Sequence, residues 1–304
     1  MFIIIGGATA TGKTFAAIEL AKKINGEIIS ADSMQVYRGM DIGTNKASQK
    51  ERKTVPHYML DIAAPSETFS AADFKKRAEK LMDEIKKRGA VPIICGGTGL
   101  YISAVIKGLF EAGKIPEKIK EELRCLEKEK GLAYLVKELK EKDSAGAKQL
   151  DLKNPRRVIR ALEIIRGTGM TLAQVREKTA RTKYPDNYCF FVTHCGRESL
   201  YKKINDRVET MIKAGLEKEV KKLLTLGLNF QNTAMQAIGY KEMALYIEGK
   251  TNLQDATDQI KQATRNYAKK QVTWFRKYTE TITVDMDNLA PDKIGEFLKS
   301  KIVT

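Results

Sequence analysis

GGATATGKT, residues 6–14, follows the apolar run Phe2–Ile5 and precedes a segment with helical periodicity. The part from Gly7 to Thr14 fits the pattern G-x-x-x-x-G-K-[ST], and a strand before it with a helix after it is the context that this motif requires. Glycines let backbone N–H groups converge on phosphate oxygens, and the start of a helix adds positive potential there. The sequence therefore predicts a binding site for a nucleotide or a diphosphate.

The residues of this loop have different expected tasks. Lys13 supplies a mobile positive charge, and the hydroxyl of Thr14 is placed to ligate Mg²⁺, which is the predicted cofactor. The loop residues expected to bind phosphate groups are Gly7, Thr9, Ala10, Thr11, Gly12, Lys13 and Thr14.

Strand and helix patterns alternate along the first hundred residues. Helical periodicity covers Lys13–Ile24 and Phe69–Arg88. The segments EIISADS (27–33), HYMLDIA (57–63) and AVPIICGGTG (90–99) indicate strands. Because strands that alternate with helices form mostly parallel sheets, the predicted fold class is α/β, a P-loop NTPase-like parallel sheet flanked by helices.

The pattern changes in the middle of the chain. Residues 117–180 show helical periodicity without a convincing strand, and residues 114–187 hold 19 Lys/Arg against 12 Asp/Glu. The strand-like YCFFVTHC (188–195) then returns to the α/β pattern, and the chain after Arg197 is expected to be helical. We therefore predict a discontinuous core domain, 1–113 and 188–304, with an all-helical insertion domain at 114–187.

Composition excludes several classes of protein. With 42% hydrophobic and 30% charged residues among 304, the chain can bury a core. No apolar stretch approaches the roughly 20 residues of a membrane span, and MFIII lacks the basic start of a signal peptide. The four cysteines form no CxxC pair, so a zinc site or a disulfide framework is not expected and a reducing cytoplasm is the expected location.

The formal net charge of +16 favours polyanionic partners. A lysine-rich, thermally adapted surface is the alternative explanation. The location of the basic residues has to decide between these two.

Asp32 is the acidic residue nearest to the end of a predicted strand, 19 residues after Lys13. A switch or motor NTPase usually has a later strand that ends in Asp, whereas PIIC (92–95) runs into Gly96-Gly97-Thr98. A carboxylate at Asp32 would face the edge of the sheet where ligands bind. There it could hold magnesium or accept a proton from a nucleophile, unless it only caps the next turn.

Seven segments occur in a fixed order: GGATATGKT, ISADSMQVYRGMDIGTNK, VPHYMLDI, SAADF, GGTGLY, NPRRVIRALEI and AIGYKE. Together they resemble the tRNA dimethylallyltransferases, also called isopentenyltransferases, from Ile5 to about Lys277. The resemblance implies transfer of a dimethylallyl group from dimethylallyl diphosphate to N6 of the adenosine immediately 3′ of the tRNA anticodon. The loop would then hold a diphosphate leaving group, and no NTP need be hydrolysed.

The same resemblance assigns the chemistry to particular residues. Asp32 is the expected general base for the N6 proton. Thr98 matches a family position at the catalytic channel and would help to hold the amine or the diphosphate, with a helix N-cap as the alternative. Arg197 matches a family arginine expected to reach the diphosphate, whereas a surface charge is the expectation for Arg207.

Recognition of the tRNA anticodon stem-loop is implied by other segments. An adenosine stacked in that loop must be flipped out to reach a buried carboxylate. Gln35 could read a base edge and Met34 could form an apolar wall, while Tyr240 either stacks on RNA or packs in the core. The basic face of NPRRVIRALEI would meet phosphates, unless it is only solvated. The residues expected to bind tRNA are Asp32, Ser33, Met34, Gln35, Arg156, Arg157, Arg160, Gln236, Gly239, Tyr240 and Lys241. His57 and His194 are expected to be structural.

Other functions stay open from the sequence. Plant adenylate isopentenyltransferases use a similar core on AMP, ADP or ATP, but the basic charge favours tRNA. A P-loop nucleoside or nucleotide kinase and a basic RNA-binding protein that senses a nucleotide are the further alternatives. The chain lacks the cysteine–histidine set of the eukaryotic zinc finger and therefore resembles the compact bacterial form, expected to be a monomer without membrane association.

Overall fold

The computed structural model describes residues 1–109, 115–179 and 187–302. The chain forms two compact units, Met1–Val105 with Pro185–Thr304 and Ile106–Tyr184. The second unit begins eight residues before the predicted insertion and ends three residues before the predicted end. The predicted boundary between residues 113 and 114 lies outside the described residues.

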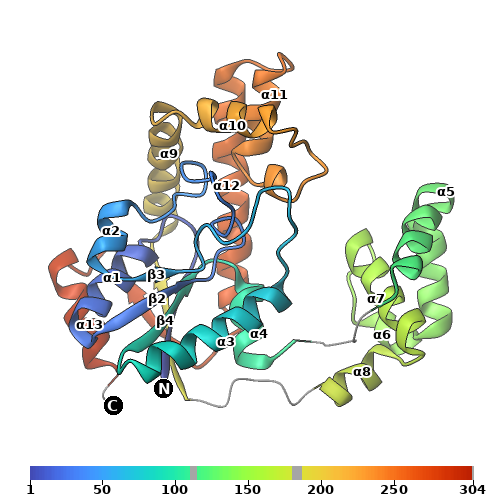
Figure 1. The fold of residues 1–304 in the computed structure, drawn as a ribbon, viewed down its shortest axis with the longest axis horizontal. Coiled ribbons are helices and arrows are strands. Elements are labelled where there is room, and N and C mark those ends of the chain that lie inside the picture. Colours follow the sequence, from blue (N-terminus) through green and yellow to red (C-terminus); the bar gives the residue numbers. More distant parts are fainter. Residues whose placement is uncertain (110–114, 180–186, 303–304) are drawn as a thin grey trace. The chain divides into compact units, whose positions relative to one another are not determined.

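A parallel sheet forms the centre of the larger unit, with the strand order β3-β2-β4-β1-β5-β6 (Figure 1). Its strands are β1 (Phe2–Gly7), β2 (Gly26–Ser30), β3 (His57–Tyr58), β4 (Val91–Gly96), β5 (Tyr188–His194) and β6 (Ile282–Asp285). Because helices cover both faces of such a sheet, its strands are continuous apolar runs, as in the fully buried β1. The predicted α/β fold class is confirmed.

Two strands differ from the sequence prediction. β3 covers only two residues of the predicted 57–63 segment, because Met59 and Asp61 have φ of +65° and +58° and cannot continue a strand. β6 lies in the part of the chain that we expected to be helical, and its Ile282–Asp285 segment pairs with β5. Four residues are too few to show a reliable period, so this edge strand had no clear signal in the sequence.

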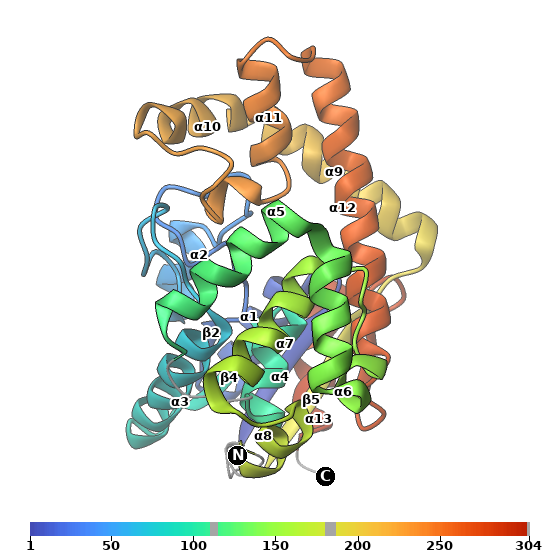
Figure 2. The ribbon, with the colours of Figure 1, turned by 90° about the vertical axis from the view of Figure 1, so that its right-hand side faces the viewer.

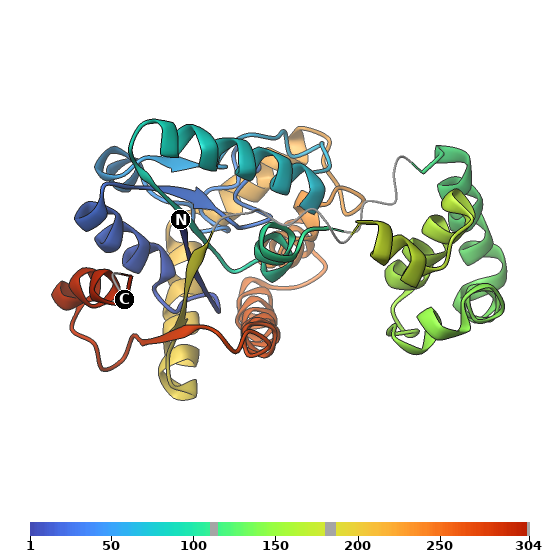
Figure 3. The ribbon, with the colours of Figure 1, turned by 90° about the horizontal axis from the view of Figure 1, so that it is seen from below.

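Helices cover both faces of the sheet. α1 (Lys13–Ile24), with the bounds predicted from periodicity, and α13 (Ile294–Ser300) pack on one face. α3 (Ala71–Lys87) and α12 (Leu253–Phe275) cover the other face (Figure 3). There the ring of Phe275 meets the ring of Phe190 edge to face. The other helices of this unit are α2 (Gln49–Thr54), α4 (Gly99–Lys107), α9 (Arg197–Lys213), α10 (Leu216–Thr225) and α11 (Tyr240–Ile247), with 3₁₀ turns at Ala234–Gln236 and Pro291–Lys293.

A helical layer formed by α9, α10, α11 and α12 stands beyond the carboxyl ends of the strands (Figures 1 and 2). In doubly wound sheets this edge is where ligands bind. None of the helices in the described ranges has the length and hydrophobicity of a transmembrane segment.

In its described residues the smaller unit consists of helices joined by short turns. They are α5 (Glu117–Lys142), α6 (Ser144–Lys148), α7 (Pro155–Thr168) and α8 (Leu172–Thr179). α5 is interrupted at Gly131, whose φ of +75° is outside the helical range. The buried carboxylate of Asp143 accepts hydrogen bonds from the N–H groups of Gly146 and Leu172, both at 2.8 Å, and so joins two helix ends.

Candidate active site

The predicted phosphate loop connects β1 to α1 at the carboxyl edge of the sheet. Ala10 and Gly12 have φ of +63° and +82°, so the loop turns through the left-handed region that glycine favours. At Gly7, with φ of +144°, an added Cβ would lie 2.4 Å from Thr193 Oγ1. The chain therefore needs glycine at Gly7 to pass this close to β5.

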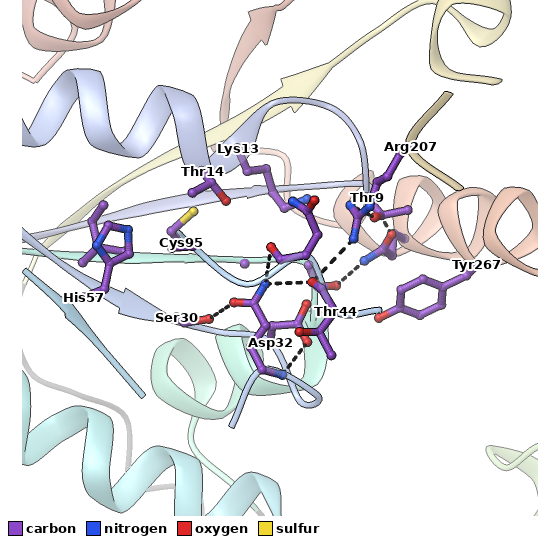
Figure 4. A pocket seen from close by; sticks show the side chains of 17 residues that line it. Thr9, Lys13, Thr14, Ser30, Asp32, Thr44, His57, Cys95, Arg207 and Tyr267 are labelled. Atoms are coloured by element: carbon purple, nitrogen blue, oxygen red, sulfur yellow. Dashed lines mark hydrogen bonds between the residues drawn. The ribbon is translucent and has the colours of Figure 1, made fainter. Parts of the chain in front are cut away.

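A first cavity, which we call the donor cavity, lies under this loop (Figure 4). Its walls come from the loop, β2, β3, β4, α9 and α12, and its volume is about 80 Å³. Thr9, Lys13 and Thr14 line it. The ammonium group of Lys13 donates a hydrogen bond to the carbonyl oxygen of Ala8, and burial lowers the pKa of Lys13 to about 8. The donor cavity thus presents a cation and the hydroxyl of Thr14 near the first turn of α1.

Thr11 does not face this cavity. Its Oγ1 donates to the carbonyl oxygen of Ala8 at 2.7 Å and shares a hydrogen bond with Thr193 Oγ1 at 2.6 Å. The side chain therefore fixes the loop to β5 instead of binding phosphate. Gly7, Ala10 and Gly12 also lie outside the cavity lining, and their positive φ angles set the path of the main chain around it.

A second cavity, which we call the acceptor cavity, has a volume of about 280 Å³, close to the lower end of the roughly 300–1,000 Å³ of small-molecule sites. Its walls are largely apolar, with Met211 from α9 and Ile260 from α12. Of the residues predicted to bind tRNA, Ser33, Met34, Gln236 and Tyr240 line it together with Asp32. Five residues are shared with the donor cavity: Thr9, Asp32, Thr44, Arg207 and Tyr267.

Asp32 lies at this junction. Its Oδ1 accepts hydrogen bonds from the N–H groups of Met34 at 2.9 Å and Gln35 at 3.4 Å. Its Oδ2 has no hydrogen-bond partner among the residues that the structure describes. One carboxylate oxygen therefore caps the turn, and the other is available to a reactant at the junction.

Thr98 acts one step away from the cavities. Its Oγ1 accepts a hydrogen bond from the N–H of Ser33 at 3.0 Å, and its own N–H donates to Ala31 at 3.1 Å. Thr98 lines neither cavity. In this structure its hydroxyl holds the turn that carries Asp32.

Arg207 lines the site, so our expectation that it is only a surface charge is wrong. Its Nη1 donates a hydrogen bond to Thr9 Oγ1 at 2.9 Å, and the side chain lines both cavities. Burial lowers its pKa. The packing of α9 against the phosphate loop turns this side chain inward, which a sequence pattern of charged residues does not reveal.

Arg197, the arginine predicted to reach the diphosphate, is exposed in the first turn of α9. Its guanidinium lies 5.4 Å from the ring centre of Tyr201, and it lines neither cavity. Ten residues of helix separate it from Arg207, about 15 Å along the axis. The structure thus brings the second of the two arginines to the phosphate loop.

Gln271 of α12 is a site residue that the sequence analysis missed. Its Oε1 accepts from the N–H of Thr9 at 2.8 Å, and its Nε2 donates to the carbonyl oxygen of Gly97 at 2.9 Å. A Cβ added at Gly97 would lie 2.3 Å from that Nε2. The buried amide therefore joins the two glycine turns, and no motif around Gln271 signals this contact.

Gln35 is held by its neighbours and does not face the acceptor cavity. Its Nε2 donates to the carbonyl oxygen of Thr44 at 3.1 Å, and its Oε1 accepts from the Ser30 hydroxyl at 2.8 Å. Gln35 lines the donor cavity only. In this structure its amide therefore braces the turn after β2 against the segment around Thr44.

The segment 236–241 has mixed roles. Tyr240 is fully buried, and its hydroxyl donates a hydrogen bond to Glu219 at 2.6 Å. It therefore packs in the core, which was one of the two roles expected for it. Gln236 is exposed and lines the acceptor cavity. Gly239, with φ of +94°, and the exposed Lys241 line neither cavity.

The three predicted arginines of the smaller unit lie on α7. Arg156, Arg157 and Arg160 are exposed, whereas Val158 between them is buried, as the amphipathic pattern predicts. Together with Arg176 they line a shallow pocket of this unit. The guanidinium of Arg160 also pairs with Glu163 at 2.8 Å.

Comparison with known proteins decides the family. The family model described as IPP transferase matches residues 35–278. The chain belongs to the IPP transferase family. A tRNA dimethylallyltransferase of Caldanaerobacter subterraneus subsp. tengcongensis is 43% identical over 282 residues, which are 91% of this chain and 89% of that protein. The family expected from the seven ordered motifs is confirmed.

Two solved structures extend the likeness of this IPP transferase. Full-length tRNA isopentenylpyrophosphate transferase from Bacillus halodurans superposes with a TM-score of 0.72 and 42% identity, over 99% of this chain and 96% of that one. A eukaryotic dimethylallyltransferase acting on tRNA gives a TM-score of 0.84 at 27% identity, over 98% of this chain and 77% of that one.

Proposed function

We propose that this protein transfers a dimethylallyl group from dimethylallyl diphosphate to N6 of the adenosine immediately 3′ of the tRNA anticodon, with release of diphosphate. The observation that carries this proposal is the junction of two cavities at Asp32 and Arg207. The donor cavity offers the phosphate loop to a diphosphate, and the apolar walls of the acceptor cavity suit a flat base. Similarity to tRNA dimethylallyltransferases over nearly the whole chain supports the same reaction.

The nucleophile in this reaction is a weak one. An exocyclic amine becomes more nucleophilic as a base takes its proton, and the available Oδ2 of Asp32 lies at the junction where the amine would enter. The new bond forms between N6 and C1 of the prenyl group while the bond from C1 to the diphosphate oxygen breaks. Asp32 collects the N6 proton, and the electron pair leaves with the diphosphate.

Negative charge grows on the diphosphate as it departs. Lys13 and the guanidinium of Arg207 line the donor cavity and would stabilise that charge. The hydrogen bond from Arg207 to Thr9 holds the guanidinium at the loop before the donor arrives. Since these groups are fixed in advance, little reorganisation is needed when the bond breaks.

Mg²⁺ fits this loop as a partly hydrated ion. Among the described residues no cluster of three or more His, Cys, Asp or Glu is placed to hold a metal by itself. Mg²⁺ usually takes one or two protein oxygens and completes its shell with water and phosphate oxygens. The hydroxyl of Thr14 lines the donor cavity and would be such a ligand. When bound, the ion would supply positive charge to the diphosphate.

The adenosine has to leave the stack of the anticodon loop to enter the acceptor cavity. Met34 and Ile260 would then contact the faces of the base, and Gln236 at the exposed rim would meet its surroundings. We assign the exposed arginines of α7 to the phosphates of the anticodon stem-loop.

Label transfer from radiolabelled dimethylallyl diphosphate, with Mg²⁺ and without ATP, tests the proposal. Unmodified tRNA and AMP are offered separately. We expect label on one adenosine of the tRNA. Label on AMP alone would instead identify an adenylate isopentenyltransferase, and consumption of ATP with a small acceptor would identify a kinase.

The substitution Asp32→Asn distinguishes the role of Asp32 as a general base from its role as a turn cap. Asparagine keeps an Oδ1 that can accept from Met34 and Gln35, but it cannot take a proton. We expect the single-turnover rate to fall by roughly 10²–10⁴, the range of general-base catalysis, while tRNA affinity changes less than about threefold. Filter binding beside the kinetics checks both. An equal loss of rate and affinity would reduce Asp32 to a structural cap.

A further inference from the structure

His57 occupies one end of the donor cavity, although its sequence context suggested a structural role (Figure 4). β3 pairs with β2 so that His57 stands beside Ile28. Every second residue along β2 and its continuation points to the same side of the sheet, and three such residues line the donor cavity: Ile28, Ser30 and Asp32. The cavity therefore follows β2 from Asp32, at the junction with the acceptor cavity, to His57 at its inner end.

The ring of His57 has one nitrogen engaged and one unsatisfied. Nδ1 lies 2.7 Å from the carbonyl oxygen of Val55, so Nδ1 carries the hydrogen and Nε2 is a hydrogen-bond acceptor. Nε2 is buried and has no hydrogen-bond partner within the described part of the chain. Burial lowers the pKa of His57, which keeps the ring neutral. Because buried polar groups are nearly always paired, this acceptor calls for a partner.

The lining that the donor cavity shares with His57 includes the apolar side chains of Ile28, Ala47 and Cys95, and Glu51 and Arg52 lie close enough to act on the pKa of the ring. Burial raises the pKa of the Cys95 thiol to about 12, so that it stays neutral. The hydroxyl of Ser30 already donates to Gln35. A short hydrocarbon chain fits such walls. The hydrogen-bond acceptor at their end suits a hydrogen-bond-donating group on the last carbon of that chain.

The distances agree with this arrangement. Four residues of extended chain separate Asp32 from Ile28, roughly 13 Å at about 3.3 Å per residue. A prenyl chain with a terminal hydroxyl measures about 5 Å from C1 to the oxygen, and contacts of about 3 Å join it to the amine and to the ring nitrogen. The hydroxylated prenyl chain with these two contacts reaches about 11 Å, which is of the same order as the Cα spacing from Asp32 to Ile28.

We infer that His57 recognises the far end of the donor, and that this site accepts an allylic diphosphate with a hydroxyl on its terminal carbon, which donates a hydrogen bond to His57 Nε2. The inference rests on the proposed prenyl transfer. The bonds that form and break are the same: N6 bonds to C1, the diphosphate leaves with the electron pair, and Asp32 takes the proton. The distal hydroxyl is retained in the product.

The test compares two donors with one unmodified tRNA in the presence of Mg²⁺. They are dimethylallyl diphosphate and the same compound with a hydroxyl on one terminal methyl group. The ratio of kcat/KM for the hydroxylated donor over the plain donor is measured for the unsubstituted protein and four variants. His57→Phe and His57→Leu remove the acceptor, His57→Gln keeps one, and His194→Leu changes the other histidine, which is exposed and lines neither cavity.

We expect the unsubstituted protein to use the hydroxylated donor at least as efficiently as the plain one. His57→Phe and His57→Leu should lower the ratio by roughly tenfold or more, because the donor hydroxyl then loses its partner in a buried place. The ratio should recover in His57→Gln and stay unchanged in His194→Leu.

Two results would overturn the inference: a hydroxylated donor used more than about 100-fold less efficiently by the unsubstituted protein, or the same ratio with and without the His57 acceptor. If one of the two acceptor-free variants fails to fold, as thermal melting shows, the other still provides the ratio. Use of neither donor by the unsubstituted protein would instead contradict the proposed prenyl transfer itself.

Discussion

Arg207 connects the two cavities through a single side chain, donating from Nη1 to Thr9 Oγ1 at 2.9 Å. We expect Arg207→Gln to lower kcat/KM for prenyl transfer by roughly 10²–10³, because a fixed positive charge facing the leaving diphosphate is lost. Arg197→Gln in the exposed first turn of the same helix is the matched control and should change kcat/KM less than about twofold. A comparable loss in the control would restore the role that the family resemblance implies for Arg197.

Lys13 makes donor binding depend on pH. Burial lowers its pKa to about 8 in the free protein, and a bound diphosphate favours the protonated form. The affinity for dimethylallyl diphosphate, which is fully ionised above about pH 7, should therefore stay level to pH 8 and then fall by up to about tenfold per pH unit. Lys13→Met should bind more weakly and lose this slope. Calorimetric titration without tRNA checks it, and a level profile from pH 8 to 10 in the unsubstituted protein would contradict it.

At the scale of elements, α10 and the loop at residues 41–43 are joined by one carboxylate. Glu219 accepts from the three consecutive main-chain N–H groups of that loop, at 2.9–3.1 Å, and from the Tyr240 hydroxyl at 2.6 Å. Glu219→Ala leaves these donors unpaired, so we expect the free energy of unfolding to fall by about 2–3 kcal/mol. Urea denaturation measures this. Glu217→Ala on the same helix removes a partly exposed carboxylate that pairs with Lys221 one turn away, and should stay within about 0.5 kcal/mol. Equal losses would mean that the loop contact is unimportant.

At the scale of the whole molecule, the net charge of +16 is shared by two units with different expected tasks. The double substitution Arg156→Ala with Arg157→Ala should weaken tRNA binding about tenfold and reduce the slope of log affinity against log salt by about 2. Donor affinity should not change, because the donor cavity is formed within the larger unit. Fluorescence anisotropy at several salt concentrations measures the slope. An unaltered slope would mean that Arg156 and Arg157 face solvent and do not contact tRNA phosphates.

The sequence by itself determined the local features of this protein. The strand–loop–helix unit around residues 6–14, the bounds of α1 and the amphipathic α7 followed from spacing and periodicity, which act between close neighbours in the chain. The family followed from seven segments in a fixed order, and the comparisons confirm it. The position of Asp32 at the edge of the sheet followed in the same way, because β2 ends just before it.

Only the tertiary structure decided which side chains meet at the site. Thr9 and Gln271 are 262 residues apart in the sequence, and Arg207 reaches the loop only because α9 packs beside it. His57 lines the donor cavity because β3 pairs with β2 at Ile28. The direction of a side chain depends on the packing of distant elements, and this information is absent from the short-range pattern around each residue.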